Sequence, residues 1–153
     1  MIVVSIDPSI NFTGFAIHSD NKLVSHELLI PNKCDEDYVQ KSRTIYSLIK
    51  SIYDDIDTTK KLVLETPEYW KVSGHAARES GSVFKLTFLC GMISTIDENI
   101  VITTPSGWKG QMSKDVVNNR LRSVYPEVNI EKTNHNIVDA IGIGHWYIDK
   151  GSK

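Results

Sequence analysis

Residues 1–6, MIVVSI, form a near-continuous apolar run that is rich in β-branched side chains. A strand with one face in water would alternate apolar and polar residues, so this run predicts a strand that is buried on both faces. Asp7, Pro8 and Ser9 follow with turn-forming chemistry and end the strand. The chain therefore begins with an interior strand of a sheet that other elements cover on both sides.

The rest of the chain alternates between short apolar runs, which predict strands, and a helical hydrophobic period. Ser113 begins one helix as a cap with Asp115 in its first turn, and Pro126 ends that helix. The pattern predicts strands over 12–18, 23–30, 61–65 and 100–104, helices over 35–57, 76–98, 113–126 and 134–149, and a loop over 105–112.

These elements predict a single α/β domain over residues 1–153, with no repeat, linker or low-complexity segment. The first three strands are joined by tight turns and form an antiparallel meander. Crossover helices force the last two strands parallel to the first. We therefore expect a mixed five-stranded sheet, a three-strand antiparallel meander plus two parallel strands, that is flanked by helices.

Composition places the chain among ordinary soluble globular proteins, with 41% hydrophobic and 24% charged residues. No apolar run approaches the ~18–20 residues of a membrane span, and the N-terminus lacks the basic region and cleavage site of a signal peptide. Cys34 and Cys90 are isolated and fit no metal-ligand spacing. We expect a cytoplasmic protein with reduced thiols.

The net charge of −2 by itself argues weakly against a nucleic-acid partner. If several of the acids lie in a metal site, the bound cation would cancel their charge. Binding to nucleic acid would then depend on positive charge in one local region. Basic residues with few acids among them occupy one segment: Lys71, Arg78, Lys85, Lys109, Lys114, Arg120 and Arg122. A solvated surface is the simpler interpretation of this segment, and contact with DNA phosphates is the alternative.

Asp7 and Glu65 each end an apolar strand just before a turn. Either residue alone would be an ordinary turn residue. Sites in such sheets lie at the carboxyl ends of the parallel strands, so neighbouring strands would place both carboxylates side by side. Such a pair repels itself unless a proton or a cation lies between. Mg²⁺ prefers hard oxygen ligands, and two ions about 3.5–4 Å apart can hold the attacking water and the leaving oxygen of a phosphodiester.

Asp139 lies among small and apolar residues in the predicted last helix. A buried acid without a partner is costly, and a metal shared with Asp7 and Glu65 would provide that partner. The alternative is an acid in a first turn that the helix dipole favours. Asn136 and His135 lie three and four residues earlier, so both share the face of Asp139.

With these residues the sequence resembles the RuvC-like Holliday junction resolvases, especially the small phage-type proteins. The matching motifs are Ile6-Asp7-Pro8-Ser9 with Thr13-Gly14, Leu64-Glu65, Thr104-Pro105-Ser106 with Lys109, and Asp139-Ala140-Ile141-Gly142. They span almost the whole chain in the family's order. The resemblance implies a ribonuclease H-like fold, a homodimer, Mg²⁺ or Mn²⁺ with two ions per active site, and paired symmetric nicks in a four-way DNA junction. A phage-encoded protein of this kind would act in the cytosol of its bacterial host.

By this resemblance Asp7, Glu65 and Asp139 are metal ligands. Asn136 stands where the family usually has a fourth acid or a histidine. Either its carbonyl oxygen or the neighbouring His135, as ligand or proton carrier, would complete the site.

The family also places basic residues near the cleaved strand, at the positions of Lys109 and Lys114. Tyr69 and Trp70 follow the Glu65 strand, where the family carries an aromatic that stacks on an unpaired base at the junction centre. Exposed surface lysines and a tryptophan that covers the edge of the core are the alternatives.

Three other functions fit parts of the pattern. A related ribonuclease H-like nuclease would act on flaps or forks, and a non-catalytic protein would bind junctions without cutting them. The segment from Asp7 to Gly14 also resembles the phosphate loop of actin-like ATPases and sugar kinases, but that fold needs two such domains to enclose a nucleotide.

Overall fold

One mixed sheet organises the molecule, which a computed structural model describes over residues 1–68 and 81–151. The strands lie in the order β3-β2-β1-β4-β5. β1 pairs antiparallel with β2 and parallel with β4, β2 pairs antiparallel with β3, and β4 pairs parallel with β5. Their bounds are Ile2–Asp7 (β1), Thr13–Ser19 (β2), Lys22–Leu29 (β3), Lys60–Glu65 (β4) and Val101–Thr103 (β5). The predicted five-stranded mixed sheet is confirmed.

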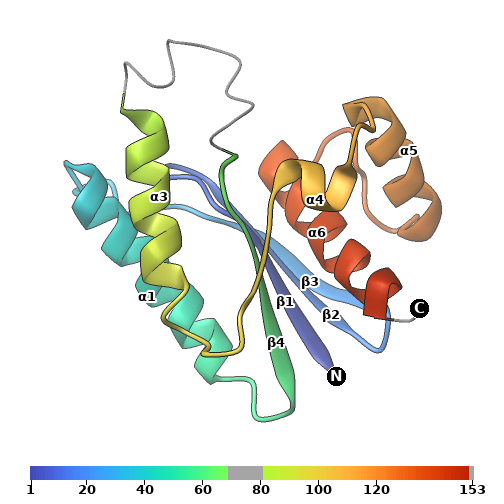
Figure 1. Cartoon of the computed structure of the whole chain (residues 1–153), viewed down its shortest axis with the longest axis horizontal. Coiled ribbons are helices and arrows are strands. Elements are labelled where there is room, and N and C mark those ends of the chain that lie inside the picture. The colour runs from blue at the N-terminus through green and yellow to red at the C-terminus, as the bar shows by residue number, and fades with distance from the viewer. Residues whose placement is uncertain (69–80, 152–153) are drawn as a thin grey trace.

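Helices cover both faces of this sheet (Figure 1). α1 and α3 pack on one face over Val4, Ile6, Leu62 and Leu64, while α6 and its neighbours α4 and α5 lie on the other, over Val3 and Val63. The bounds are Tyr38–Asp54 (α1), Ser82–Ile93 (α3), Pro105–Lys109 (α4), Lys114–Val124 (α5) and His135–Gly151 (α6). In the described part of the chain, no helix combines the length and the apolarity that crossing a bilayer requires.

The helix predicted over 76–98 was too long at its C-terminal end, because α3 stops at Ile93. The hydroxyls of Ser94 and Thr95 donate to the carbonyls of Gly91 and Met92, at 2.8 and 2.7 Å. Such local side-chain bonds compete with the helical ladder and favour a turn. Residues 76–80 lie outside the described part. The helix predicted over 35–57 is also shorter, and it begins after Asp37, whose carboxylate accepts from Val39 and Gln40 N–H.

The loop predicted over 105–112 contains a short helix, α4. Thr104 caps it, because its hydroxyl accepts from Gly107 N–H at 3.2 Å, and Pro105 occupies the first helical position. Both residues are favoured at those places. The prediction was wrong here because a helix of five residues has too little hydrophobic period to detect.

His18 is a buried ionisable group between the sheet and α6. Its side chain is fully buried, and within the described structure neither ring nitrogen has a hydrogen-bond partner. Tyr125 packs against it with ring centroids 5.7 Å apart. Burial and then the nearby His145 lower the pKa of His18 to about 4, so the ring is neutral in the folded protein at neutral pH.

Acid should therefore destabilise the fold through His18. Above pH 6.5 the ring is neutral in the folded and in the unfolded state, so its titration does not change the free energy of unfolding. Below pH 6.5 the unfolded chain binds a proton on His18, whereas the folded chain binds it only below about pH 4. The loss of unfolding free energy across this window should be on the order of 2–3 kcal/mol. Urea unfolding of wild type and His18→Leu between pH 7.5 and 4.5 measures it.

The His18→Leu protein should lose less stability over the same window, while His26→Gln, which removes an exposed histidine of β3, should follow the wild type. If the free energy of unfolding of wild type and of His18→Leu depended on pH in the same way, His18 would not be the group that destabilises the fold in acid.

Candidate active site

Asp7 and Glu65 meet at the carboxyl ends of two neighbouring parallel strands. The register pairs Ile6 of β1 with Leu64 of β4, and the two acids come next in each strand. Ile6 and Leu64 are fully buried and form an apolar floor, and Asp7 itself is only 9% exposed. The predicted juxtaposition of the two carboxylates is therefore found in the fold.

The turn after Asp7 is held by its own side chains. Thr13 Oγ1 donates to the carbonyl of Ser9 at 2.7 Å and accepts from Ser9 N–H at 3.1 Å. This closed turn leads directly into β2, where Gly14 pairs with Asp7. The Asp-Pro-Ser turn and the Thr-Gly pair thus form one local unit around the carboxylate.

Asp139 joins the pair from α6, which packs on β1 and β2. Gly14 permits this approach: a Cβ at that position would lie 1.9 Å from the carbonyl oxygen of Asn136. Burial, then Glu65, then Asp139 raise the pKa of Asp7 to about 8, and Lys109 opposes them. The three carboxylates thus act on one another, as the sequence predicted.

Two consecutive residues of α4 interact with this cluster. The Trp108 indole N–H donates to Glu65 Oε2, and Lys109 Nζ lies 3.6 Å from Asp139 Oδ2. Burial raises the pKa of Glu65, while the Trp108 hydrogen bond and the Lys109 charge lower it. The Lys109 side chain is 29% exposed, so it lies at the margin between the cluster and solvent.

Glu68 is a further acid near the cluster that the sequence analysis did not identify. Its Oε1 accepts from Ser106 N–H at 3.2 Å and from the Ser106 hydroxyl, so it holds the start of α4. Its charge also raises the pKa of Glu65. The available signals were the spacing of Glu68 three residues after Glu65 and the cap sequence Thr104-Pro105, which indicates a helix at the site.

Asn136 and His135 lie on the first turn of α6 but face different surroundings. Asn136 is 8% exposed, and its Nδ2 donates to the carbonyl of Phe12 before β2. His135 is exposed and lines a polar pocket of about 100 Å³ that Asp139 and Lys114 also line. Asn136 is therefore held by the turn beside Asp7, and His135 stands on the solvent side of Asp139.

Of the six remaining predicted DNA contacts, two belong to the described residues and four do not. Lys114 is exposed at the start of α5 and shares the polar pocket with Asp139. Lys85 is exposed on α3, which packs on the opposite face of the sheet from α4 and α6. The other four candidates, Tyr69, Trp70, Lys71 and Arg78, lie outside the described residues.

The donor set fits a divalent cation by its chemistry, because three mutually repelling carboxylates supply hard oxygen ligands and an unbalanced negative charge. Their spacing is not that of a formed site: over residues 1–68 and 81–151, no three His, Cys, Asp or Glu side chains lie close enough to hold a metal ion together. Glu65 and Asp139 are instead engaged by Trp108 and Lys109.

The same fold occurs in two solved structures of RuvC from Thermus thermophilus. RuvC in complex with a Holliday junction substrate matches with a TM-score of 0.73 and 15% identity, covering 99% of this chain and 97% of that chain. A second RuvC structure matches with a TM-score of 0.72 at the same identity and coverage. No protein-family profile and no curated protein sequence matches the chain. The predicted ribonuclease H-like fold is confirmed by these likenesses.

Proposed function

We propose that this protein is a structure-selective endonuclease that resolves four-way DNA junctions by metal-dependent phosphodiester hydrolysis, with paired symmetric nicks. The observation that carries the proposal is the placement of Asp7 and Glu65 at the carboxyl ends of β1 and β4, with Asp139 of α6 near enough to raise the pKa of Asp7. The fold shared with a RuvC structure that holds a Holliday junction substrate supports the choice of branched DNA.

Asp7, Glu65 and Asp139 are the proposed ligands of Mg²⁺ or Mn²⁺, with two ions per active site. Bound there, such ions would supply a nucleophilic water at neutral pH and stabilise the charge that develops on the scissile phosphate. The fourth ligand is either Asn136 or His135. Asn136 of α6 is hydrogen-bonded to the turn beside Asp7, whereas the position of His135 on the solvent side of Asp139 suits a proton carrier.

Basic and aromatic residues around the cluster are the proposed DNA contacts. Lys109 lies 3.6 Å from Asp139 and can reach a phosphate oxygen beside that carboxylate. Lys114 would bind a neighbouring phosphate from the polar pocket. Lys71, Lys85 and Arg78 are proposed to contact the junction arms, and Tyr69 and Trp70 to stack on an unpaired base at its centre.

A cleavage assay on four DNA substrates tests the function. Four-way junction, flap, fork and linear duplex are compared in Mg²⁺, and the expected result is paired nicks in the junction alone. Equal cleavage of flaps and forks would indicate a related nuclease for other branched DNA. Tight junction binding without cleavage in Mg²⁺ or Mn²⁺ would indicate a binding protein, and ATP turnover by the chain would support the actin-like alternative.

Replacing Lys114 with alanine should weaken junction binding uniformly across arm sequences. Each phosphate contact releases counterions, so the log–log dependence of affinity on salt should flatten by roughly 0.9. Titrations of the binding constant against salt concentration measure this slope. The matched control is Lys50→Ala on α1, whose ammonium pairs with Asp54 at 2.7 Å on the other face of the sheet. Equal slopes for wild type and Lys114→Ala would show that Lys114 is an ordinary surface lysine that contacts no phosphate.

The proposed paired nicks need two active sites related by a two-fold axis, so we expect a homodimer. α3 is the candidate interface, but Leu89 and Ile93 face the core and are not available for it. Phe84 is 68% exposed, and Phe88, whose ring lies 5.6 Å from that of Tyr38 of α1, is 36% exposed. These two rings are the apolar surface that α3 offers to a partner.

Phe84→Glu should therefore shift the protein from dimer to monomer in sedimentation at micromolar concentration. A charged side chain in the centre of an apolar contact remains unpaired and costs several kcal/mol, roughly 2–5. Val24→Glu, at a 63% exposed residue of the edge strand β3, is the matched control and should leave the dimer intact. A monomeric wild type, with and without junction DNA, would refute the assembly.

A further inference from the structure

We propose that Trp108 is a positioning residue for Glu65: its indole N–H fixes Oε2 of the carboxylate and leaves Oε1 to the cation site. The inference deepens the proposed function and rests on it, because it assigns the group that orients one of the proposed metal ligands.

The hydrogen bond joins two distant parts of the chain. Trp108 belongs to the five-residue helix α4, yet it is only 6% exposed and its indole N–H reaches Glu65 at the end of β4. An indole has one polar hydrogen and no acceptor, so it occupies one lone pair of the carboxylate and adds no charge. The negative charge of Glu65 therefore remains available to a cation, which a lysine in the same place would partly cancel.

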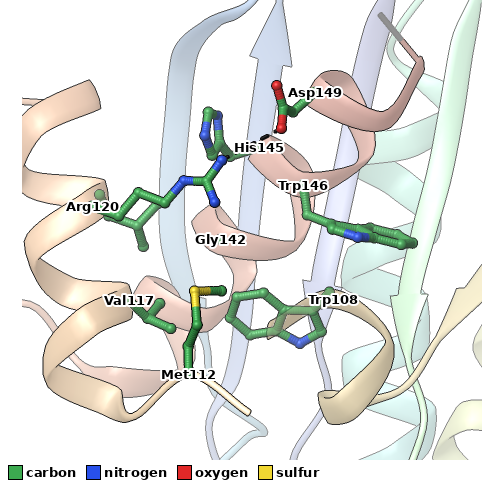
Figure 2. A pocket seen from close by; sticks show the side chains of 9 residues that line it. Trp108, Met112, Val117, Arg120, Gly142, His145, Trp146 and Asp149 are labelled. Atoms are coloured by element: carbon green, nitrogen blue, oxygen red, sulfur yellow. Dashed lines mark hydrogen bonds and ion pairs between the residues drawn. The ribbon is translucent and has the colours of Figure 1, made fainter. Parts of the chain in front are cut away.

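Two contacts restrict the position of the ring. A Cβ on Gly142 of α6 would lie 2.6 Å from Cζ3 and 2.9 Å from Cη2 of the indole, so the glycine admits the ring against the helix backbone. The ammonium of Lys109 lies 4.9 Å from the ring centroid. Figure 2 shows the indole at the edge of a pocket that Met112 and Gly142 also line. The volume of this pocket is about 60 Å³.

The start of α4 is fixed as well, because Glu68 binds Ser106 and Thr104 caps the helix. A side chain that is confined by its ring contacts and by its helix can orient Glu65. Removal of a hydrogen-bond partner that fixes the geometry of a metal ligand typically lowers metal affinity about 10–100-fold.

Removing only the N–H gives the sharpest test. Incorporation of 3-benzothienylalanine at position 108 replaces the N–H by sulfur and keeps the shape of the ring. Mn²⁺ affinity is then measured directly from the electron paramagnetic resonance of the unbound ion, without DNA or turnover. We expect roughly 10–100-fold weaker Mn²⁺ binding, together with a rise in the Mg²⁺ concentration for half-maximal cleavage and partial recovery of the rate at saturating Mg²⁺.

Trp146 provides the matched control for this substitution. It lines the same pocket, and it also carries a lysine over its ring, with Lys150 Nζ 5.0 Å from the centroid. Within the described residues, no hydrogen bond or ion pair joins Trp146 to the three carboxylates. The same analogue at position 146 should leave Mn²⁺ affinity unchanged.

A spectroscopic signature tests the hydrogen bond without any metal. The Trp108 indole proton, assigned by its loss in Trp108→Phe, should resonate downfield because its acceptor is a charged carboxylate. Glu65→Gln should move it upfield and should leave the Trp146 indole proton in place. An indole proton that does not respond to Glu65→Gln would overturn the inference.

The outcomes separate this inference from the proposed function. A wild type that binds Mn²⁺ and cleaves junctions, with unchanged Mn²⁺ affinity in the analogue at position 108, overturns the role of Trp108 alone. Equal losses for the analogues at positions 108 and 146 overturn it too, because the effect would then come from the pocket. A wild type that has the indole signature but neither binds Mn²⁺ nor cleaves junctions overturns the proposed function, and the inference with it.

Discussion

Replacing Asp7 with asparagine is expected to reduce junction cleavage by about 10³-fold or more, with junction binding retained or tightened. The amide keeps the shape of the side chain but loses the charge that a divalent cation requires, and groups that act as a unit in catalysis produce losses of this size. Where Asp7 is ionised, above its pKa of about 8, removal of its negative charge beside the DNA also lowers repulsion of the phosphates. Single-turnover cleavage and equilibrium binding on the same junction measure both effects, and Glu65→Gln and Asp139→Asn should behave in the same way.

The stability of the same variant should change in the opposite direction to its activity. Burial and two neighbouring acids raise the pKa of Asp7 from 3.8 to about 8. The folded state therefore holds a proton that the unfolded chain releases, and wild-type stability falls as the pH rises from about 4 to 8. Asp7→Asn removes this loss, so in metal-free buffer at pH 8 its Tm should exceed that of the wild type.

Added Mg²⁺ should raise the Tm of the wild type but not that of Asp7→Asn, because a ligand that binds only the folded state stabilises it. Glu98→Gln, at an exposed residue after α3, is the control and should follow the wild type in every measurement. Near-normal turnover in any of the three amide variants would exclude that residue from the site.

The sheet and two of the three proposed acids could be predicted because the physics that determines them is local. Short β-branched runs locate the strands, and crossover connections make β1, β4 and β5 parallel. The carboxyl ends of parallel strands share one edge, so Asp7 and Glu65 had to meet once their strands were neighbours. Asp139 was predictable for a different reason, since its apolar flanks in the sequence indicated an acid that needs a partner. In the structure its side chain is 29% exposed and pairs with Lys109.

The contacts that complete the site could not be predicted because they depend on where α4 lies. The bond from Trp108 to Glu65 spans 43 residues, and the bonds from Ser106 to Glu68 span 38. No residue pattern fixes the orientation of a five-residue helix, which here follows from Gly142 and the packing of α6. The overlong prediction for α3 has a similar cause, because the hydroxyls that end it act through local bonds and not through hydrophobicity.

Gly14→Ala should unfold or severely weaken the protein, with a loss of at least about 3 kcal/mol of unfolding free energy. Its Cβ would lie 1.9 and 2.2 Å from the carbonyl oxygen and carbon of Asn136, and 2.8 Å from the Ile137 nitrogen. All three are backbone atoms, so no change of rotamer relieves the clash, and α6 must move away from β2. Urea unfolding measures the loss.

The same displacement would withdraw Asp139 from Asp7, since α6 carries one acid and Gly14 pairs directly with the other. Variant protein that remains folded at low temperature should therefore also lose Mn²⁺ affinity and cleavage. Gly91→Ala, in α3 where an added Cβ meets nothing within 4 Å, is the matched control and should gain up to about 1 kcal/mol from helix propensity. If Gly14→Ala matched wild-type stability, α6 could not lie as close to β2 as the proposed site requires.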